Sequence, residues 1–262
     1  MTRTLLTAIA LGMSTPVFAV LSVTTGLIHP TRRSWAFAAR WWARSLLVPA
    51  GVRLEVSGRE HVTDGAPRVF VGNHQSALDI PILMQALGGD IRFMAKKSLF
   101  RIPLFGWALS ANRFIPIDRS SARTVTRRLD RALEELRRDP VSIALFPEGT
   151  RSPDGRLLPF RRGAMKICRR SEMGVVPFTI DGAVNVLCRT GYRVTPGTVR
   201  LVFARPIPAE EVAAMTPAQL HDRIRSTIAR ELDSSSHRSV SVSVGAESAP
   251  GAARRETEIT VP

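Results

Sequence analysis

The amino-terminal stretch is apolar and uncharged. Residues 4–28 contain no charged side chain, although they include several Ser and Thr, two Gly and Pro16. A bilayer crossing takes about 20 predominantly apolar residues, so this segment is long enough to span. The pattern leaves three interpretations open: a membrane helix that crosses or re-enters, a signal peptide with a cleavage site near residues 17–19, or a buried core helix.

Residues 34–48 change to a helical period. Apolar positions recur three or four residues apart, as in an amphipathic helix, and they are Trp35, Ala38, Ala39, Trp42 and Leu46. Trp beside Arg is typical of the headgroup boundary of a bilayer, and the alternative is a surface helix packed on the domain. We therefore expect residues 1–50 to form hydrophobic and amphipathic membrane-anchoring helices. If residues 4–28 span, the arginines that follow place the main domain in the cytoplasm.

From residue 51 onward, short apolar runs alternate with helical stretches. Several runs are almost wholly apolar, which is typical of strands covered on both faces. The clearest helical stripe is 120–138, and a last helix fits 216–232. This alternation predicts an α/β fold, with a mixed central sheet flanked by helices. The β-like runs are 52–57, 68–72, 91–95, 113–117, 141–146, 175–180 and 199–204.

The composition changes again near the carboxyl terminus. Residues 234–262 are rich in Ser, Ala and Arg and have no stable period, which is typical of disorder. The expected organisation is therefore 1–50 as membrane-anchoring helices, 51–233 as the α/β domain and 234–262 as a mostly disordered tail.

The net charge narrows the classes of partner that the protein is expected to bind. The 262 residues include 37 Lys and Arg against 22 Asp and Glu, a net charge of +15, which favours an anionic partner such as nucleic acid, acidic headgroups or phosphorylated substrates. The two cysteines are too few for a disulfide framework. The five histidines show no zinc-site spacing and no nucleotide-binding glycine motif is present, so neither a metal nor a cofactor is expected.

The sequence NHQSALD, residues 73–79, follows one of the apolar runs. Asp79 comes five positions after His74. Residues at this spacing do not lie on the same face of a helix, so we expect His74 in a turn and Asp79 in the first turn of a helix. Ser76 and Asp79 match a capping box. The carboxylate could then hold one imidazole nitrogen while the other acts as a base. Ser76 as a nucleophile and a chance match are the alternatives.

A second polar cluster, FPEGTRS, occupies residues 146–152. Gly149 allows close backbone approach, and Thr150, Arg151 and backbone amides can face an anion, because Arg grips phosphate with two parallel hydrogen bonds. Glu148 would repel phosphate, so we expect it to orient Arg151 or contact a substrate hydroxyl. The alternative is a surface turn.

Two further basic residues, Arg119 and Lys97, follow predicted strands. Taken together, four ordered blocks resemble the glycerolipid acyltransferases typified by 1-acyl-sn-glycerol-3-phosphate acyltransferase. A stretch FRRG at 160–163 is similar to the F-K-x-G of that family, with Arg in place of Lys. The resemblance covers about residues 60–205, and its blocks are NHQSALD (73–79), RFIPIDR (113–119), FPEGTRS (146–152) and VVPF (175–178).

The resemblance implies a mechanism. His74 would deprotonate the free hydroxyl of a lysophospholipid while Asp79 fixes the imidazole tautomer. The hydroxyl would attack an acyl thioester carried by coenzyme A or acyl carrier protein, with no metal or cofactor. Arg151, with Gly149 and Thr150, would hold the acceptor phosphate. The residues expected to bind substrate are Arg119, Glu148, Gly149, Thr150, Arg151 and Lys97.

The implied reaction is acylation of the sn-2 hydroxyl of 1-acyl-sn-glycerol 3-phosphate to phosphatidic acid, in phospholipid biosynthesis at the cell membrane, with the catalytic domain facing the cytoplasm. Membrane lipids are then expected partners. Glycerol 3-phosphate or another lysophospholipid is an alternative acceptor. A non-catalytic basic module that binds membrane or nucleic acid is an alternative from another class. Nucleic acid is not an expected partner, because the chain has one Tyr and most Phe lie in apolar runs.

Overall fold

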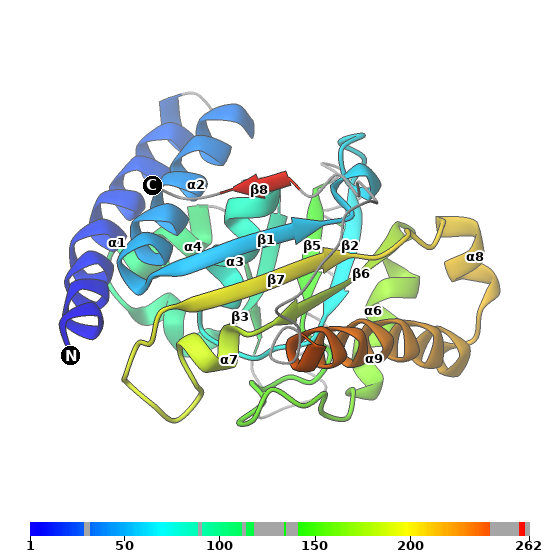
Figure 1. The fold of residues 1–262 in the computed structure, drawn as a ribbon. Coiled ribbons are helices and arrows are strands. Elements are labelled where there is room, and N and C mark those ends of the chain that lie inside the picture. Colours follow the sequence, from blue (N-terminus) through cyan, green and yellow to red (C-terminus); the bar gives the residue numbers. More distant parts are fainter. Residues whose placement is uncertain are drawn as a thin grey trace.

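The computed structural model describes residues 1–28, 32–88, 91–111, 114–117, 134, 141–241 and 257–259. Helices α1 (Thr2–Ile28) and α2 (Arg32–Ala50) pack side by side along one flank of the molecule (Figure 1). The first strand, β1 (Val52–Ser57), begins two residues after α2 ends.

Within the described residues, eight strands form one sheet in the order β4-β3-β5-β2-β6-β7-β1-β8. The sheet is mixed, as predicted: β6 and β7 pair antiparallel, as do β1 and β8, while the other neighbours are parallel. The remaining strands are β2 (Arg68–Gly72), β3 (Ile91–Lys96), β4 (Ile115–Ile117), β5 (Ser142–Leu145), β6 (Gly174–Asp181), β7 (Gly197–Phe203) and β8 (Thr257–Ile259).

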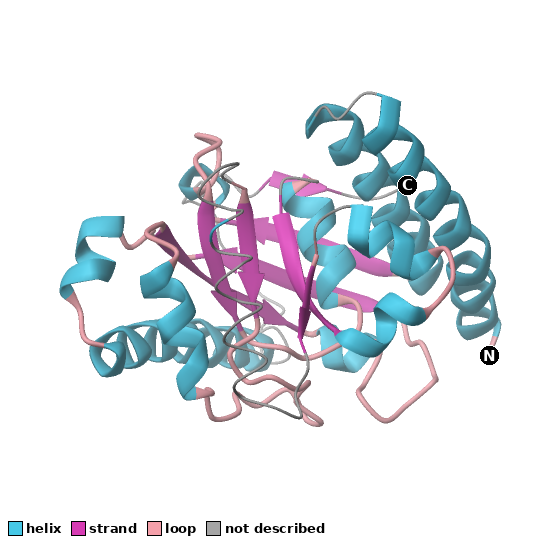
Figure 2. Cartoon of the chain, turned by 180° about the vertical axis from the view of Figure 1, so that it is seen from behind, coloured by secondary structure: helices cyan, strands magenta, loops and turns pink. Residues whose placement is uncertain are grey.

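Helices cover both faces of the sheet (Figure 2). They are α3 (Asp79–Leu87), α4 (Phe105–Ala111), α6 (Arg162–Arg170), α7 (Ala183–Val186), α8 (Ala209–Ala214) and α9 (Pro217–Ser241), with short 3₁₀ turns η1 (Arg59–His61) and η2 (Lys97–Arg101). Except for residue 134, the predicted helix 120–138 lies outside the described residues.

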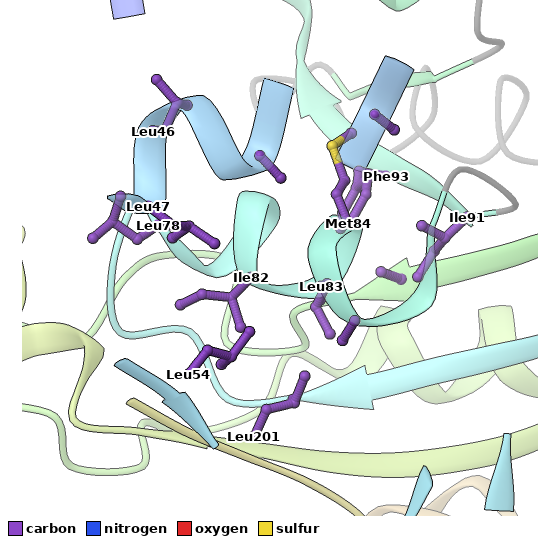
Figure 3. Packing of buried hydrophobic residues seen from close by; sticks show 14 of the residues in the cluster. Leu46, Leu47, Leu54, Leu78, Ile82, Leu83, Met84, Ile91, Phe93 and Leu201 are labelled. Carbon is purple, nitrogen blue, oxygen red and sulfur yellow. The ribbon is translucent and has the colours of Figure 1, made fainter. Parts of the chain in front are cut away.

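Apolar side chains form two separate cores, one on each face of the sheet. One joins α2 and α3 to the sheet: Leu47 and Ile82 lie close to Leu54 of β1 and Leu201 of β7 (Figure 3). The other joins α6 and α9 to the opposite face through residues such as Met165 and Ile224. The central strand β6 is buried from Val175 to Ile180, which explains its nearly continuous apolar sequence.

The structure differs from the predicted tail. Helix α9 continues to Ser241, well past residue 233, and residues 257–259 form β8 on the edge of β1. The rest of 234–262 lies outside the described residues. An unpaired sheet edge readily accepts a further strand, and β8 pairs with the outer edge of β1 in this way.

Helix α1 exposes most of its apolar surface. Among the described residues it is the single helix that is long and apolar enough to cross a membrane, over Thr2–Thr24, and only 22% of its most apolar window is buried. That low fraction does not fit the interpretation of a buried core helix. Its contact with α2 centres on Phe18, whose ring stacks on Trp42 at 5.2 Å between centroids.

Candidate active site

The parallel strands β2 and β5 bring the two polar clusters together. They are neighbours in the sheet and run in the same direction, so the loops that follow them leave at the same edge. His74 lies in the first loop and Glu148 in the second. In α/β proteins, this carboxyl edge is where ligand crevices form.

His74 and Asp79 meet as their spacing predicts. His74 lies in the turn after β2, Asp79 is the first residue of α3, and the imidazole Nδ1 is 2.6 Å from Asp79 Oδ2. Because Nδ1 faces a carboxylate, it carries the proton, which leaves a lone pair on Nε2. Within the described chain, Nε2 has no hydrogen-bond partner. The ring can therefore accept a proton from a bound molecule.

Asp79 is held rigidly in the interior. Its side chain is fully buried, and Oδ2 also accepts the backbone N–H groups of Gln75 at 2.7 Å and Ser76 at 3.0 Å. Together with the His74 imidazole, three groups contact the same carboxylate oxygen. The acid therefore fixes both the turn and the tautomer of the imidazole.

Ser76 does not have the predicted role of a full capping box. Its N–H donates to Asp79, but its hydroxyl donates to the backbone oxygen of Leu187 at 2.6 Å, and Leu78 precedes the helix as N-cap. Ser76 is fully buried. Since the hydroxyl proton is directed at a carbonyl and the residue is inaccessible, Ser76 is not a nucleophile for a bound substrate.

The imidazole is also clamped face-on. It stacks on Phe146, with ring centroids 4.1 Å apart and an interplanar angle of 18°. Phe146 begins the second cluster and packs edge-on against Phe178 of β6. The His74 side chain stays 17% exposed. This arrangement leaves an edge of the ring open while preventing rotation.

Glu148 links the two loops, a role that differs from the predicted one. Its Oε1 accepts the His74 backbone N–H at 2.8 Å and its Oε2 accepts the Leu158 N–H at 3.1 Å. Burial raises the pKa of Glu148 to about 7, against the opposing effect of these two hydrogen bonds. With both oxygens bonded to backbone N–H groups, Glu148 joins the His74 loop to its own loop, and its role toward a substrate hydroxyl stays a prediction.

The residues after Glu148 form a tight basic turn. Gly149 has a φ of 68°, and a Cβ there would come within 2.3 Å of the Arg161 Nε, so only glycine fits. Arg161 Nε lies 3.4 Å from the Glu148 backbone oxygen. Thr150 and Arg151 follow, half-buried. Arg161 thus joins the predicted loop as a further cation, which the FRRG stretch alone identifies in sequence.

Two predicted substrate-binding residues remain, Lys97 and Arg119. Lys97 begins η2, just beyond β3, and β3 is the next strand past β5 at the same edge. Arg119 lies outside the described residues. Their roles in substrate binding stay predictions.

Asn73 is a structural residue that sequence reasoning did not single out. Its amide exchanges two hydrogen bonds with the Ile180 backbone, at 2.7 Å and 2.8 Å, which ties the end of β2 to β6. No motif pattern indicates this partner, because it lies 107 positions away.

An apolar cavity of about 560 Å³ adjoins the catalytic loop. Ala77 and Leu78, directly after the His74 turn, form part of its wall, and Gly12 of α1 and Trp42 of α2 line it elsewhere. Its volume is in the usual range for ligand pockets, about 300–1,000 Å³. Its lining comes from many separate elements, so the sequence pattern does not reveal it.

Among the described residues, no group of three or more His, Cys, Asp or Glu side chains could hold a metal ion. The acyltransferase family model matches residues 53–181, the span that carries both loops of the site. This domain belongs to the acyltransferase family. The resemblance seen in the sequence is therefore confirmed.

Several characterised acyltransferases are similar to the chain. A chloroplastic 1-acyl-sn-glycerol-3-phosphate acyltransferase of Arabidopsis thaliana is 34% identical over 79% of this chain and 57% of its own length. The human 1-acyl-sn-glycerol-3-phosphate acyltransferase alpha is 31% identical over 70% and 65%, respectively. The Pseudomonas aeruginosa 1-acyl-sn-glycerol-3-phosphate acyltransferase is 28% identical over 88% and 90%. The chain thus spans less than two thirds of the first two relatives and most of the third.

The fold is that of a solved acyltransferase. A crystal structure of the 1-acyl-sn-glycerophosphate acyltransferase from Thermotoga maritima superposes with a TM-score of 0.78, covering 88% of this chain and 94% of that chain. At 22% identity, this similarity establishes the shared architecture. The predicted fold class is therefore confirmed.

Proposed function

We propose that the protein transfers an acyl group from a thioester donor to the sn-2 hydroxyl of 1-acyl-sn-glycerol 3-phosphate, forming phosphatidic acid and a free thiol. The observation that carries this proposal is the placement of the His74–Asp79 pair between an apolar cavity and a basic loop. The names of the similar proteins support the same acceptor.

The chemistry follows from the geometry of His74. Nε2 takes the proton of the acceptor hydroxyl as its oxygen attacks the thioester carbon, and the carbon–sulfur bond then breaks. The imidazolium returns the proton to the departing thiolate, so atoms and charge balance. Asp79, hydrogen-bonded to Nδ1, stabilises the imidazolium. A positioned base of this kind contributes about 10²–10⁴-fold in rate.

The basic loop, residues 149–151, is the proposed binding site of the acceptor phosphate, and we call it the phosphate loop. Gly149, Thr150 and Arg151 provide backbone and side-chain donors, and Arg161 lies against Gly149. Arginine pairs with phosphate through charge-assisted hydrogen bonds. Because Glu148 joins this loop to the His74 backbone, binding of the phosphate would also place the acceptor hydroxyl relative to Nε2.

The apolar cavity is the proposed site of the acyl chain of the donor. It begins beside Leu78, close to His74, and extends between α1 and α4, where the lining side chains are apolar except for Thr7 and Thr15 of α1. We place the protein at the cell membrane, with the α/β domain on the cytoplasmic side, on the basis of the exposed apolar α1 and the arginines that follow it. Both the lysophospholipid and the acyl chain partition into that bilayer.

The test is an assay of purified protein in mixed micelles with labelled lysophosphatidic acid and an acyl thioester. We expect labelled phosphatidic acid from the wild type and a loss of about 10²-fold or more in kcat for His74→Ala. His61→Ala is the control, because His61 lies in η1 after β1, at the opposite edge of the sheet, where its Nδ1 is 3.0 Å from the Phe203 backbone oxygen.

Full activity of His74→Ala would exclude the proposed base. Parallel assays with glycerol 3-phosphate and with other lysophospholipids as acceptors distinguish the acceptor alternatives. Turnover of none of these acceptors by the wild type, with membrane binding intact, would favour a non-catalytic membrane-binding module.

A further inference from the structure

A basic segment lies beside the site and has no role in the chemistry described above. It consists of residues 187–194, LCRTGYRV, and we call it the strap. It connects α7 to β7 and forms the loop that lies near the N-terminus in Figure 1. The strap contains no acidic residue, and the chain has none between Asp181 and Glu210.

Three hydrogen bonds tie the strap to the surroundings of the site. The Leu187 backbone oxygen accepts the Ser76 hydroxyl at 2.6 Å, beside the His74 turn. Arg189 Nη1 donates to the backbone oxygen of Arg151 at 3.3 Å. The Val194 N–H donates to Thr4 Oγ1 of α1 at 3.0 Å. The strap therefore runs from the catalytic loop, past the phosphate loop, to the start of the apolar helix.

The middle of the strap is folded on itself. A Cβ on Gly191 would lie 2.6 Å from Cys188 Sγ, so a larger residue there would require the cysteine side chain to shift. The fold directs polar and aromatic groups outward: Arg189 and Arg193 are exposed, and Tyr192 is 90% exposed. Arg189 uses one of its five N–H donors on the Arg151 carbonyl. One segment beside the site therefore carries an exposed tyrosine and two exposed arginines.

The expected orientation of the thioester donor brings its carrier portion close to the strap. If the acyl chain lies in the cavity and the thioester lies at His74, the carrier must leave through the remaining opening. Leu187 lines the cavity, and the strap continues outward from it. The groups on its outer surface suit a nucleotide, since exposed aromatic rings stack on bases and arginines pair with phosphates.

We infer that the strap binds the nucleotide end of an acyl-coenzyme A donor, with Tyr192 stacking on the adenine and Arg189 and Arg193 pairing with the phosphates. This inference rests on the proposed acyltransferase function. It selects coenzyme A over acyl carrier protein, because an exposed aromatic ring flanked by arginines fits a single base and its phosphates. Docking of an acidic protein takes an extended charged surface of at least several hundred Å² per partner.

The experiment compares two donors with the same acyl chain: acyl-coenzyme A and an acyl thioester of N-acetylcysteamine, which lacks the nucleotide. Tyr192→Ala and Arg193→Ala should each raise the KM for acyl-coenzyme A about tenfold. They should leave the KM for the truncated thioester and the KM for the acceptor unchanged. Inhibition by adenosine 3′,5′-bisphosphate should weaken in parallel.

Arg205→Ala is the matched control, because Arg205 is an equally exposed arginine beyond the other end of β7. Arg189→Ala is assayed separately. A rise in the acceptor KM alone would assign Arg189 to holding the phosphate loop through the Arg151 carbonyl.

Three results would overturn the inference. The first is an unchanged KM for acyl-coenzyme A in both Tyr192→Ala and Arg193→Ala. The second is an equal loss with the truncated thioester. The third, from a parallel assay with acyl carrier protein as donor, is a loss confined to that donor. Turnover of the truncated thioester by wild type tests the acyltransferase function itself, so failure of the strap and failure of the reaction give different results.

Discussion

At the scale of single residues, Glu148 shows how one buried carboxyl group can join the two loops of the site. Two backbone N–H groups occupy its two oxygens, one of them from His74. At pH 5 the raised pKa keeps this carboxyl protonated, but both of its oxygens can still accept, whereas a glutamine offers one acceptor oxygen and one NH₂ group, which would face an N–H donor. We expect Glu148→Gln to lower the free energy of unfolding by about 1–3 kcal/mol at pH 5, and to lower kcat through His74.

The pH dependence gives a second measurement on the same variant. Burial raises the pKa of Glu148 from 4.5 to about 7, so between these values the folded state binds more protons than the unfolded state. This group therefore makes the wild type less stable as the pH rises from about 4.5 to 7. The variant lacks this titration, so the difference in unfolding free energy should shrink between pH 5 and pH 8.

Urea denaturation at both pH values measures that difference, with Glu210→Gln as the control, since Glu210 is exposed on α8. A difference that stays constant from pH 5 to pH 8 would contradict the raised pKa.

At the scale of elements, the cavity depends on how α1 lies against the domain. Gly12 of α1 lines the cavity, and a Cβ placed there meets nothing within 4 Å. A leucine at this position would therefore project into open space and shorten the cavity. It would also favour the helix, because glycine is a poor helix former.

We predict that Gly12→Leu shifts the donor preference toward shorter acyl chains. Each displaced methylene forfeits about 0.8 kcal/mol of burial, so kcat/KM for the longest accepted thioester should fall about tenfold when two methylenes are displaced. Met13→Leu is the control, since Met13 lies next in α1 but is 69% exposed. A uniform loss across chain lengths would show that the acyl chain lies elsewhere.

At the scale of the whole molecule, the sequence predicts which segments form strands and turns better than it predicts which segments contact one another. Period and composition predict the strands and the turn that joins His74 to Asp79, because these depend on neighbouring residues. The contact between Glu148 and His74 joins positions 74 apart, and the contact between Ser76 and Leu187 joins positions 111 apart. These contacts depend on the strand order, which periodicity does not determine. The role of Arg119 stays a prediction.

The exposed apolar surface is also a property of the whole molecule. It extends along α1 and continues on α2 and near α4, where Phe37 is 73% and Trp107 is 61% exposed. Exposed apolar areas of this extent mark an interaction site. Insertion of this surface into the bilayer would bring the nearby cavity wall within reach of lipid acyl chains.

We predict that two charges on α1, Met13→Glu with Val20→Glu, weaken binding to lipid vesicles at least tenfold, because each acid must leave water to insert. Vesicle flotation measures this binding. Turnover of a short-chain, water-soluble acceptor should stay near the wild-type rate, since neither residue lines the cavity. The double variant Ala213→Glu and Ala218→Glu adds the same charge to exposed positions of α8 and α9 and should float like the wild type. Equal flotation of both double variants would place the membrane contact on another surface, whereas loss of soluble turnover in the α1 variant would mean that α1 supports the fold of the site.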